Sequence, residues 1–274
     1  MPAMANPAPP VGFLPAAGRG LRFGSSSYYK ELYPILFDRR DGAAPPQPRP
    51  VCELALRAIR AAGAERCAIL VSADKGEFLR VVADGPGLGL ALAYVVQSQP
   101  QGLPHAVRCA MPWLGGADVV FAMPDNIVLP PRALADVHQA RLACGADLML
   151  GVFPVDEPER LGPVELSPSG AVVRIHDKPG VRTWMNSWGV ASWSARFTDF
   201  VADWDAQRDG AGSAERAIGH AFEAARVAGL GVGAVDFPGG QMHDIGTPHG
   251  LRAALRALAQ PDVVDAMLGP GLTD

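Results

Sequence analysis

Apolar runs of strand length alternate with stretches of helical periodicity in the first half of the chain, and this order limits the possible folds more than any other feature. The runs lie at residues 11–16, 66–72, 90–97, 118–123 and 147–153. Apolar residues at helical spacing separate them, at residues 50–63, 75–83, from 103 and 131–144. Strands separated by helices pair in parallel and are covered on both faces. We therefore expect an α/β fold with a mixed, mainly parallel sheet, with ligands at the carboxyl ends of its strands.

The pattern changes near residue 160. Residues 162–180 have the pattern of a hairpin whose two strands flank the turn SPSG. The elements expected after it are a strand at 186–193, helices near 194–206 and 213–228, a strand at 231–237 and a helix at 247–259. No internal repeat or long low-complexity tract marks a domain boundary. We expect a disordered lead-in at 1–10 and one domain over 11–270, elaborated at about 155–240, with a Pro-rich turn or loop at 43–50.

A glycine-rich loop, PAAGRGLRFG (15–24), follows the first strand. Glycines let backbone N–H groups approach a phosphate, and Arg19, Arg22 and the following Lys30 supply positive charge. The dinucleotide pattern GxGxxG fails at Phe23, and GxxxxGK[ST] is absent. A plain tight turn is the alternative. The cations favour a cradle for a polyphosphate.

The charge of the chain argues against nucleic acid and membranes as partners. The formal net charge is −4, and the basic residues are scattered without a Lys/Arg run. No apolar stretch approaches the length of a membrane span, and residues 1–10 lack the basic and apolar regions of a signal peptide. A small-molecule partner fits better.

The cysteines lie far apart, without a CxxC pair or a histidine at ligand spacing, at Cys52, Cys67, Cys109 and Cys144. Each has apolar neighbours in the sequence. This pattern is typical of buried thiols in a reducing compartment, so we expect a cytoplasmic protein.

With KELYPI (30–35), the glycine loop resembles the nucleotide-binding signature of sugar-1-phosphate nucleotidyltransferases, LAAGxGTRxxP followed by PKxLLPI. Further segments are similar to motifs of that family in the same order, namely residues 95–107, 121–128, 174–179, 186–193 and 243–254. The resemblance covers roughly residues 11–255, and several motifs in register make it specific. It implies the Rossmann-like, GT-A-like three-layer sandwich of these enzymes.

The resemblance also implies a reaction. An oxygen of a sugar-1-phosphate attacks the α-phosphorus of a nucleoside triphosphate, and pyrophosphate leaves. Both reactants are anionic, so their repulsion must be neutralised before they can align. Mg²⁺ prefers oxygen ligands, and two carboxylates can hold it against a phosphate. The expected cofactor is therefore Mg²⁺. Relatives usually form dimers or tetramers, so we also expect a homo-oligomer.

The motifs assign the site residues by position. The metal carboxylates would be Asp125 and Asp244, and the catalytic cations Arg22, Lys30 and Lys178. Nucleotide-binding residues would be Ala16, Ala17, Gly18, Gly20, Gln97, Gly102 and Asp125. Sugar-phosphate-binding residues would be Gly162, Glu165, Asp177, Lys178, Asn186 and Gly189.

Without the resemblance, some of these residues have structural alternatives. Asp125 could be a turn or capping residue that precedes a helix, and Asp244 or Thr247 could cap the last helix. Lys178 could be a solvated hairpin residue.

Gln97 matches the family's base-reading glutamine. Its amide offers an acceptor for the N3–H of uracil or thymine, and a backbone N–H near Gly102 could add a donor. We therefore expect UTP or dTTP, with glucose-1-phosphate as the favoured sugar substrate. The histidines His105 and His176 flank two motifs, but the attacking phosphate is already an anion and needs no base. We expect them to be structural.

The sequence departs from the family pattern at several positions. Leu21 stands where the family has threonine, Asp177 where it has glutamate, and the loop before Lys30 is short. A non-catalytic regulatory paralogue that senses sugar phosphates or nucleotides is therefore an alternative. The retained cations and carboxylates favour the enzyme. A glycosyltransferase would need a DxD motif, to which the nearest match is PDN (124–126).

Overall fold

The computed structural model describes residues 8–18, 29–38, 47–83, 87–99, 101–209 and 216–260. Of the predicted lead-in, residues 1–7 lie outside the described residues, and Pro10 is buried at the start of the first strand. Gly20 and Arg22, two of the predicted site residues, also lie outside the described residues.

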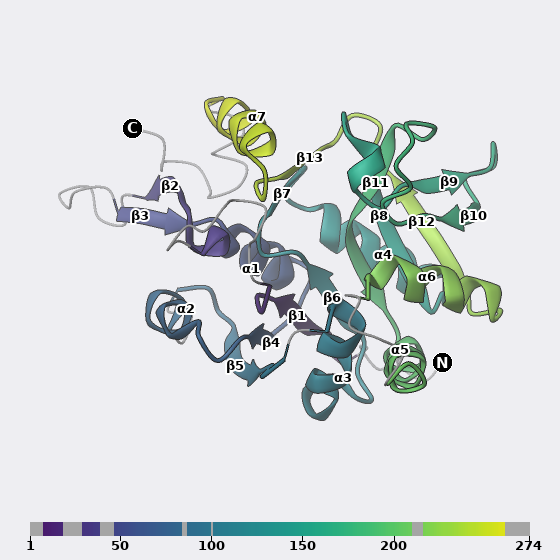
Figure 1. The fold of residues 1–274 in the computed structure, drawn as a ribbon, viewed down its shortest axis with the longest axis horizontal. Helices are drawn as coiled ribbons and strands as arrows, with labels where there is room; N and C mark the ends of the chain where they lie inside the picture. Colours follow the sequence, from purple (N-terminus) through teal and green to yellow (C-terminus); the bar gives the residue numbers. More distant parts are fainter. Residues whose placement is uncertain are drawn as a thin grey trace, which may run out of the picture.

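A mixed, mainly parallel sheet forms the centre of the molecule (Figure 1). Its seven strands lie in the order β12 (Val232–Asp236), β8 (Leu148–Pro154), β11 (Asn186–Trp193), β6 (Val119–Ala122), β1 (Val11–Pro15), β4 (Arg66–Val71) and β5 (Ala91–Val96). β11 runs antiparallel to both of its neighbours, and the other pairs are parallel. The α/β fold expected from the alternating apolar runs is confirmed.

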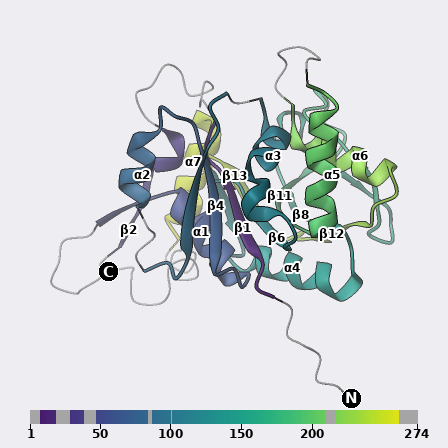
Figure 2. The same cartoon turned by 90° about the horizontal axis from the view of Figure 1, so that it is seen from below.

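Helices cover both faces of this sheet (Figure 2). One face packs against α1 (Cys52–Ala61), α2 (Gly76–Val82) and α4 (Ala133–Cys144). The other packs against α3 (Leu103–Leu114), α5 (Ala195–Ala206) and α6 (Ile218–Val227). The result is the predicted three-layer sandwich, and the last helix, α7 (Pro248–Leu258), lies beside it.

Each face of the sheet buries its own hydrophobic core, because successive side chains of a strand point to opposite faces. In β1, Phe13 belongs to the core under α3, α5 and α6, whereas Leu14 belongs to the core under α1, α2 and α4. The ring of Phe13 packs against Phe121 and Trp193, at centroid distances of 5.8 and 6.3 Å. This packing fixes the central strands and the loops that leave their ends.

The predicted hairpin forms from β9 (Val164–Leu166) and β10 (Val172–Ile175), joined by a turn in which the N–H of Gly170 donates to the carbonyl of Ser167. Close to it lies a short 3-10 helix, η3 (Pro158–Arg160).

Short strands were missed in two places. The helix expected at 131–144 forms as α4, but Asn126–Leu129 before it forms β7, paired antiparallel with β13 (Gln241–Asp244). Half-buried and buried side chains alternate along β7, as expected for a strand. Four residues are too few for this alternation to be recognised in the sequence. In the Pro-rich stretch, Gln47–Pro50 forms β3, paired with β2 (Pro34–Asp38). A two-stranded ribbon accepts prolines because each strand has a free edge.

The expectation of four buried thiols was also wrong in part. Cys52 and Cys67 are buried, and burial raises their pKa. Cys109 is half-buried, and Cys144, the last residue of α4, is exposed. Apolar neighbours in the sequence do not show that a residue at the end of a helix, such as Cys144, faces solvent.

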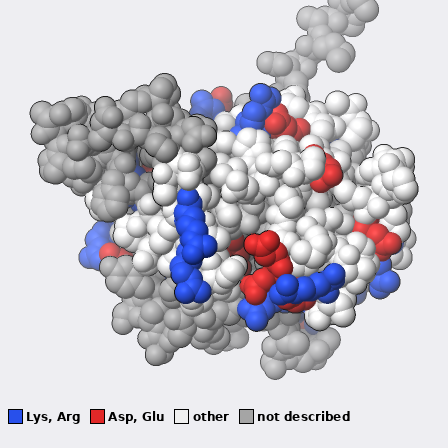
Figure 3. Space-filling model, turned by 90° about the horizontal axis from the view of Figure 1, so that it is seen from above, with Lys and Arg blue, Asp and Glu red and all other residues white. Residues whose placement is uncertain are grey.

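Charged side chains are dispersed over the surface. On the face drawn in Figure 3, described Lys and Arg side chains lie apart from one another and mostly beside Asp or Glu. Within the described part of the chain, no helix combines the length and apolar character needed to cross a membrane.

Candidate active site

A cavity of about 330 Å³ opens where the parallel strands β1, β5 and β6 end and β11 begins. Its walls also include the loop after β10 and the start of α6. The predicted site residues that line it are Ala17, Gly18, Lys30, Gln97, Gly102, Asp125, Gly162, Asp177, Lys178 and Asp244. The fold therefore brings together segments more than 200 residues apart in the chain, as expected at the carboxyl ends of the strands.

A larger cavity of about 510 Å³ lies between α1, β7 and the start of α4. Its lining is mainly apolar and contains no carboxylate among the described residues. Because the proposed chemistry needs anionic and cationic groups together, we place the candidate site in the smaller cavity.

Asp125 and Asp244 meet through the ladder between β7 and β13. The register pairs Asp244 with Asn126, and the N–H of Ile245 donates to the carbonyl of Asp125 at 3.1 Å. The Oδ1 atom of Asp244 accepts a hydrogen bond from the N–H of Gly246 at 2.7 Å. Asp125 is almost fully buried, and its Oδ1 atom has no hydrogen-bond partner among the described residues.

Lys30 extends from a short 3-10 helix, η2 (Lys30–Leu32), and its ammonium group forms an ion pair with Oδ2 of Asp125. Burial by itself would lower the pKa of Lys30. The negative charge of Asp125, with smaller contributions from Glu31 and Asp244, outweighs burial and raises that pKa. The ammonium group is therefore charged at neutral pH.

The carboxylates of Asp125 and Asp244 suit a magnesium ion whose other ligands come from the phosphates of a substrate. Among the described residues, no group of three or more His, Cys, Asp or Glu side chains could hold a metal by itself. Mg²⁺ in phosphate-transfer sites commonly takes one or two carboxylates, with phosphate and water oxygens completing its ligands. The buried Oδ1 atom of Asp125, which has no hydrogen-bond partner among the described residues, suits that role.

A second buried ion pair lies at the wall of the cavity, and sequence analysis missed it. Lys75, in the turn before α2, pairs with Glu31 at 3.0 Å, and their side chains are 1% and 2% exposed. Lys75 Nζ also donates to the carbonyl of Ala16 at 2.5 Å and lies 5.2 Å from the ring centroid of Tyr29. It thereby ties the end of β1 to the segment that carries Lys30. In the sequence SADKG, nothing distinguished this lysine from a solvated turn residue.

On the opposite side, the segment around Gly102 is held against Arg216. The two residues form a parallel β-bridge, and Gly102 has a φ of 103°. A Cβ at Gly102 would lie 2.0 Å from the carbonyl oxygen of Arg216, so this position requires glycine. This contact joins the predicted nucleotide segment to the start of α6.

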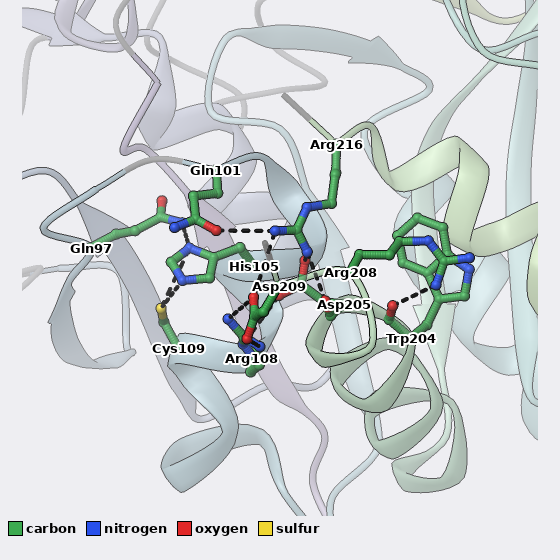
Figure 4. A network of polar contacts seen from close by, with 10 residues as sticks. All are labelled: Gln97, Gln101, His105, Arg108, Cys109, Trp204, Asp205, Arg208, Asp209 and Arg216. Carbon is green, nitrogen blue, oxygen red and sulfur yellow. Dashed lines mark hydrogen bonds and ion pairs between the residues drawn. The ribbon is translucent and has the colours of Figure 1, made fainter. Parts of the chain in front are cut away.

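A network of two arginines and two aspartates fixes this junction (Figure 4). Asp205, fully buried at the end of α5, pairs with Arg108 at 3.1 Å and with Arg216 at 2.5 Å. Asp209 pairs with Arg108 at 2.6 Å, and Arg216 also donates to Gln101 at 3.1 Å. Because a buried carboxylate must be paired, the network holds α3, α5 and the segment before α6 in one arrangement.

The residues predicted to bind the sugar phosphate divide into two groups. Lys178 lines the cavity with a φ of 45°, and its N–H donates to the carbonyl of Leu161 at 2.8 Å. Gly162 lies against the indole of Trp188, which would be 2.1 Å from a Cβ at that position. Asp177 lines the cavity beside Gly219, in the first turn of α6, where the helix dipole favours a negative charge.

Four other predicted residues that the structure describes do not line this cavity. The amide of Asn186 bonds both the N–H and the carbonyl of Val164, at 2.9 and 3.0 Å, and so joins β11 to β9. Glu165 lies 3.6 Å from His176 on the hairpin. Gly189 packs against Met242 and lines the larger cavity. Ala16 is fully buried directly after β1.

Comparison with known proteins gives the chain its family. The profile of the family described as nucleotidyl transferase matches residues 29–261. The chain belongs to this family. The resemblance to sugar-1-phosphate nucleotidyltransferases seen in the motifs is thereby confirmed at the level of the family.

Relatives of this nucleotidyl transferase include glucose-1-phosphate thymidylyltransferases of two Streptomyces species. That of Streptomyces griseus is 34% identical over 148 residues, which cover 54% of this chain and 41% of the relative. That of Streptomyces antibioticus is 35% identical over 132 residues, 48% of this chain and 36% of the relative. The aligned part of the chain thus spans less than half the length of these relatives.

A solved structure of UDP-glucose pyrophosphorylase, complexed with UDP-glucose, has a similar fold. Its TM-score is 0.73 at 18% sequence identity, covering 91% of this chain and 98% of that one. At this identity the likeness concerns the fold alone.

Proposed function

We propose that this nucleotidyl transferase moves a nucleotidyl group from UTP or dTTP to a sugar-1-phosphate, with glucose-1-phosphate favoured. The products are an NDP-sugar and pyrophosphate. One observation carries this proposal: Lys30, Asp125 and Asp244 gather in the same cavity as Lys178. The names of the relatives, thymidylyltransferases and a pyrophosphorylase, support it.

The chain's own residues supply charge and orientation. Lys30 and Arg22 would neutralise the triphosphate, while Lys178 would hold the phosphate of the sugar for attack on the α-phosphorus. The bond between that phosphorus and the bridging oxygen breaks, and pyrophosphate leaves. Asp125 and Asp244 would hold Mg²⁺, which when bound stabilises the negative charge on the α-phosphate.

A non-catalytic regulatory protein of the same fold is the alternative function. Such a protein needs no metal-binding carboxylates. Here Asp125, whose Oδ1 atom has no hydrogen-bond partner among the residues that the structure describes, pairs with the charged Lys30. We therefore favour the enzyme. The homo-oligomer and the cytoplasmic location stay predictions.

The base preference provides the experiment. Gln97 is buried and lines the cavity next to Gly102. An unmatched hydrogen-bonding group at a buried edge costs about 1–3 kcal/mol. We therefore expect kcat/KM for UTP or dTTP to exceed that for CTP by roughly tenfold or more, and purines to be poorer still. The measurement is pyrophosphate release with glucose-1-phosphate, Mg²⁺ and each of UTP, dTTP, CTP, ATP and GTP. A preference for CTP or a purine nucleotide would contradict the role of Gln97.

A further inference from the structure

The amide of Gln97 has a fixed neighbour, His105. Gln97 lies just after β5, and His105 lies in the first turn of α3. The Nε2 atom of Gln97 is 2.6 Å from Nδ1 of His105. Gln97 borders the cavity, whereas His105 does not. Figure 4 shows the amide nitrogen turned toward the imidazole ring and the amide oxygen turned away from it.

The surroundings of His105 keep its ring neutral at physiological pH. Burial lowers the pKa of His105, Arg108 and Arg216 act in the same direction, and Asp205 and Asp209 oppose them. A neutral imidazole carries one N–H and one acceptor nitrogen.

The contact with Gln97 sets the tautomer of His105, because an amide N–H can only donate and Nδ1 must then accept. The sulfur of Cys109 lies 3.9 Å from Nδ1 and 3.7 Å from Nε2, so it favours neither nitrogen. With the hydrogen on Nε2, Nδ1 is free to accept from the amide of Gln97. The amide oxygen of Gln97 then remains as an acceptor for a group other than His105.

We propose that His105 is a positioning residue that orients the Gln97 amide. Through this orientation it makes the site prefer uracil and thymine over cytosine. This inference rests on the proposed function. The N3 atom of uracil and of thymine carries a hydrogen, which the oxygen of the oriented amide accepts. The N3 atom of cytosine is an acceptor, so that oxygen and cytosine N3 would repel each other.

Protonation of His105 reverses this arrangement. Both ring nitrogens then carry hydrogens, so Nδ1 can no longer accept from Gln97, and the amide turns its oxygen toward the ring. The amide nitrogen is then presented to the base, which favours cytosine. Because burial places the pKa of His105 below its ordinary value, the preference is complete at neutral pH and declines as the pH falls into the acidic range.

The test is competition between UTP and CTP in one reaction with glucose-1-phosphate, from about pH 5.5 to pH 8. For the wild-type protein we expect the UTP/CTP ratio of kcat/KM to decrease as the pH falls. His105→Leu removes the acceptor, and we expect it to reduce the ratio at pH 7 by about tenfold. His105→Glu supplies an acceptor that cannot donate when ionised, so it should retain the ratio at pH 7.

A matched control is His176→Leu, which removes a histidine that stacks on Trp184, at 3.8 Å between ring centroids. We expect it to leave the UTP/CTP ratio of kcat/KM unchanged.

If His105→Leu keeps the wild-type ratio while lowering kcat/KM for both nucleotides equally, His105 has a merely structural role and the inference is overturned. A wild-type ratio that stays constant as the pH falls through the pKa of His105 overturns it as well, without any variant. Absence of turnover by the wild-type protein with every nucleotide would instead overturn the proposed function.

Discussion

Asp125→Asn and Asp244→Asn are each expected to lower kcat/KM by about a hundredfold or more while the protein stays folded. Each change removes one anionic oxygen from the pair that the β7–β13 ladder brings together. A neutral amide binds Mg²⁺ more weakly than a carboxylate does, so charge on the α-phosphate would lose its stabilisation. The measurement is pyrophosphate release over a range of Mg²⁺ concentrations, with urea unfolding of each variant to confirm that it is folded.

Asp136→Asn is the matched control. Asp136 lies in α4 and pairs with the exposed Arg132, away from the cavity. The same chemical change there should leave turnover and its Mg²⁺ dependence unchanged. Near-native turnover of Asp125→Asn or Asp244→Asn at limiting Mg²⁺ would exclude that residue from the metal site.

Lys75→Met is expected to lower the free energy of unfolding by about 3–5 kcal/mol. The side chains of Lys75 and Glu31 are almost completely buried, and Oε2 of Glu31 already lacks a hydrogen-bond partner among the described residues. Removal of the ammonium group leaves a buried carboxylate without its counter-charge and frees the carbonyl of Ala16. Urea unfolding at neutral pH measures the effect.

Two further variants identify the cause of this destabilisation. Arg80→Met removes an exposed cation from α2, whose pair with Glu77 is largely in solvent, and should change stability by less than about 1 kcal/mol. The double variant Lys75→Met/Glu31→Leu contains no unpaired buried charge, so it should recover a large part of the loss. If Lys75→Met is as mild as Arg80→Met, the buried pair is not what holds the end of β1 to η2.

The strands β1, β4, β5, β6 and β8 could be predicted from the sequence because each lies in a largely continuous apolar run. The side chains in β1 and β6 are buried along their whole length, and a parallel sheet requires such strands. β13 escaped notice because QMHD contains one buried apolar residue, Met242, and its pairing with β7 is a long-range contact. Periodicity reports which side of an element is buried, and it does not report partners far away in the chain.

The candidate site shows the same limit. Motif positions placed Lys30, Asp125 and Lys178, all of which line the cavity. The same positions suggested Asn186, whose amide the structure shows engaged with the backbone of Val164. Lys75 and Arg216 could not be assigned, because their importance comes from buried carboxylates that only the folded chain places beside them.

The measurement that tests the central claim most directly is release of pyrophosphate from UTP or dTTP by the purified protein. We expect release that requires both Mg²⁺ and glucose-1-phosphate, with one NDP-glucose formed for each pyrophosphate. A protein that binds the nucleotide and the sugar phosphate but releases no pyrophosphate would contradict the account and identify a sensing protein instead.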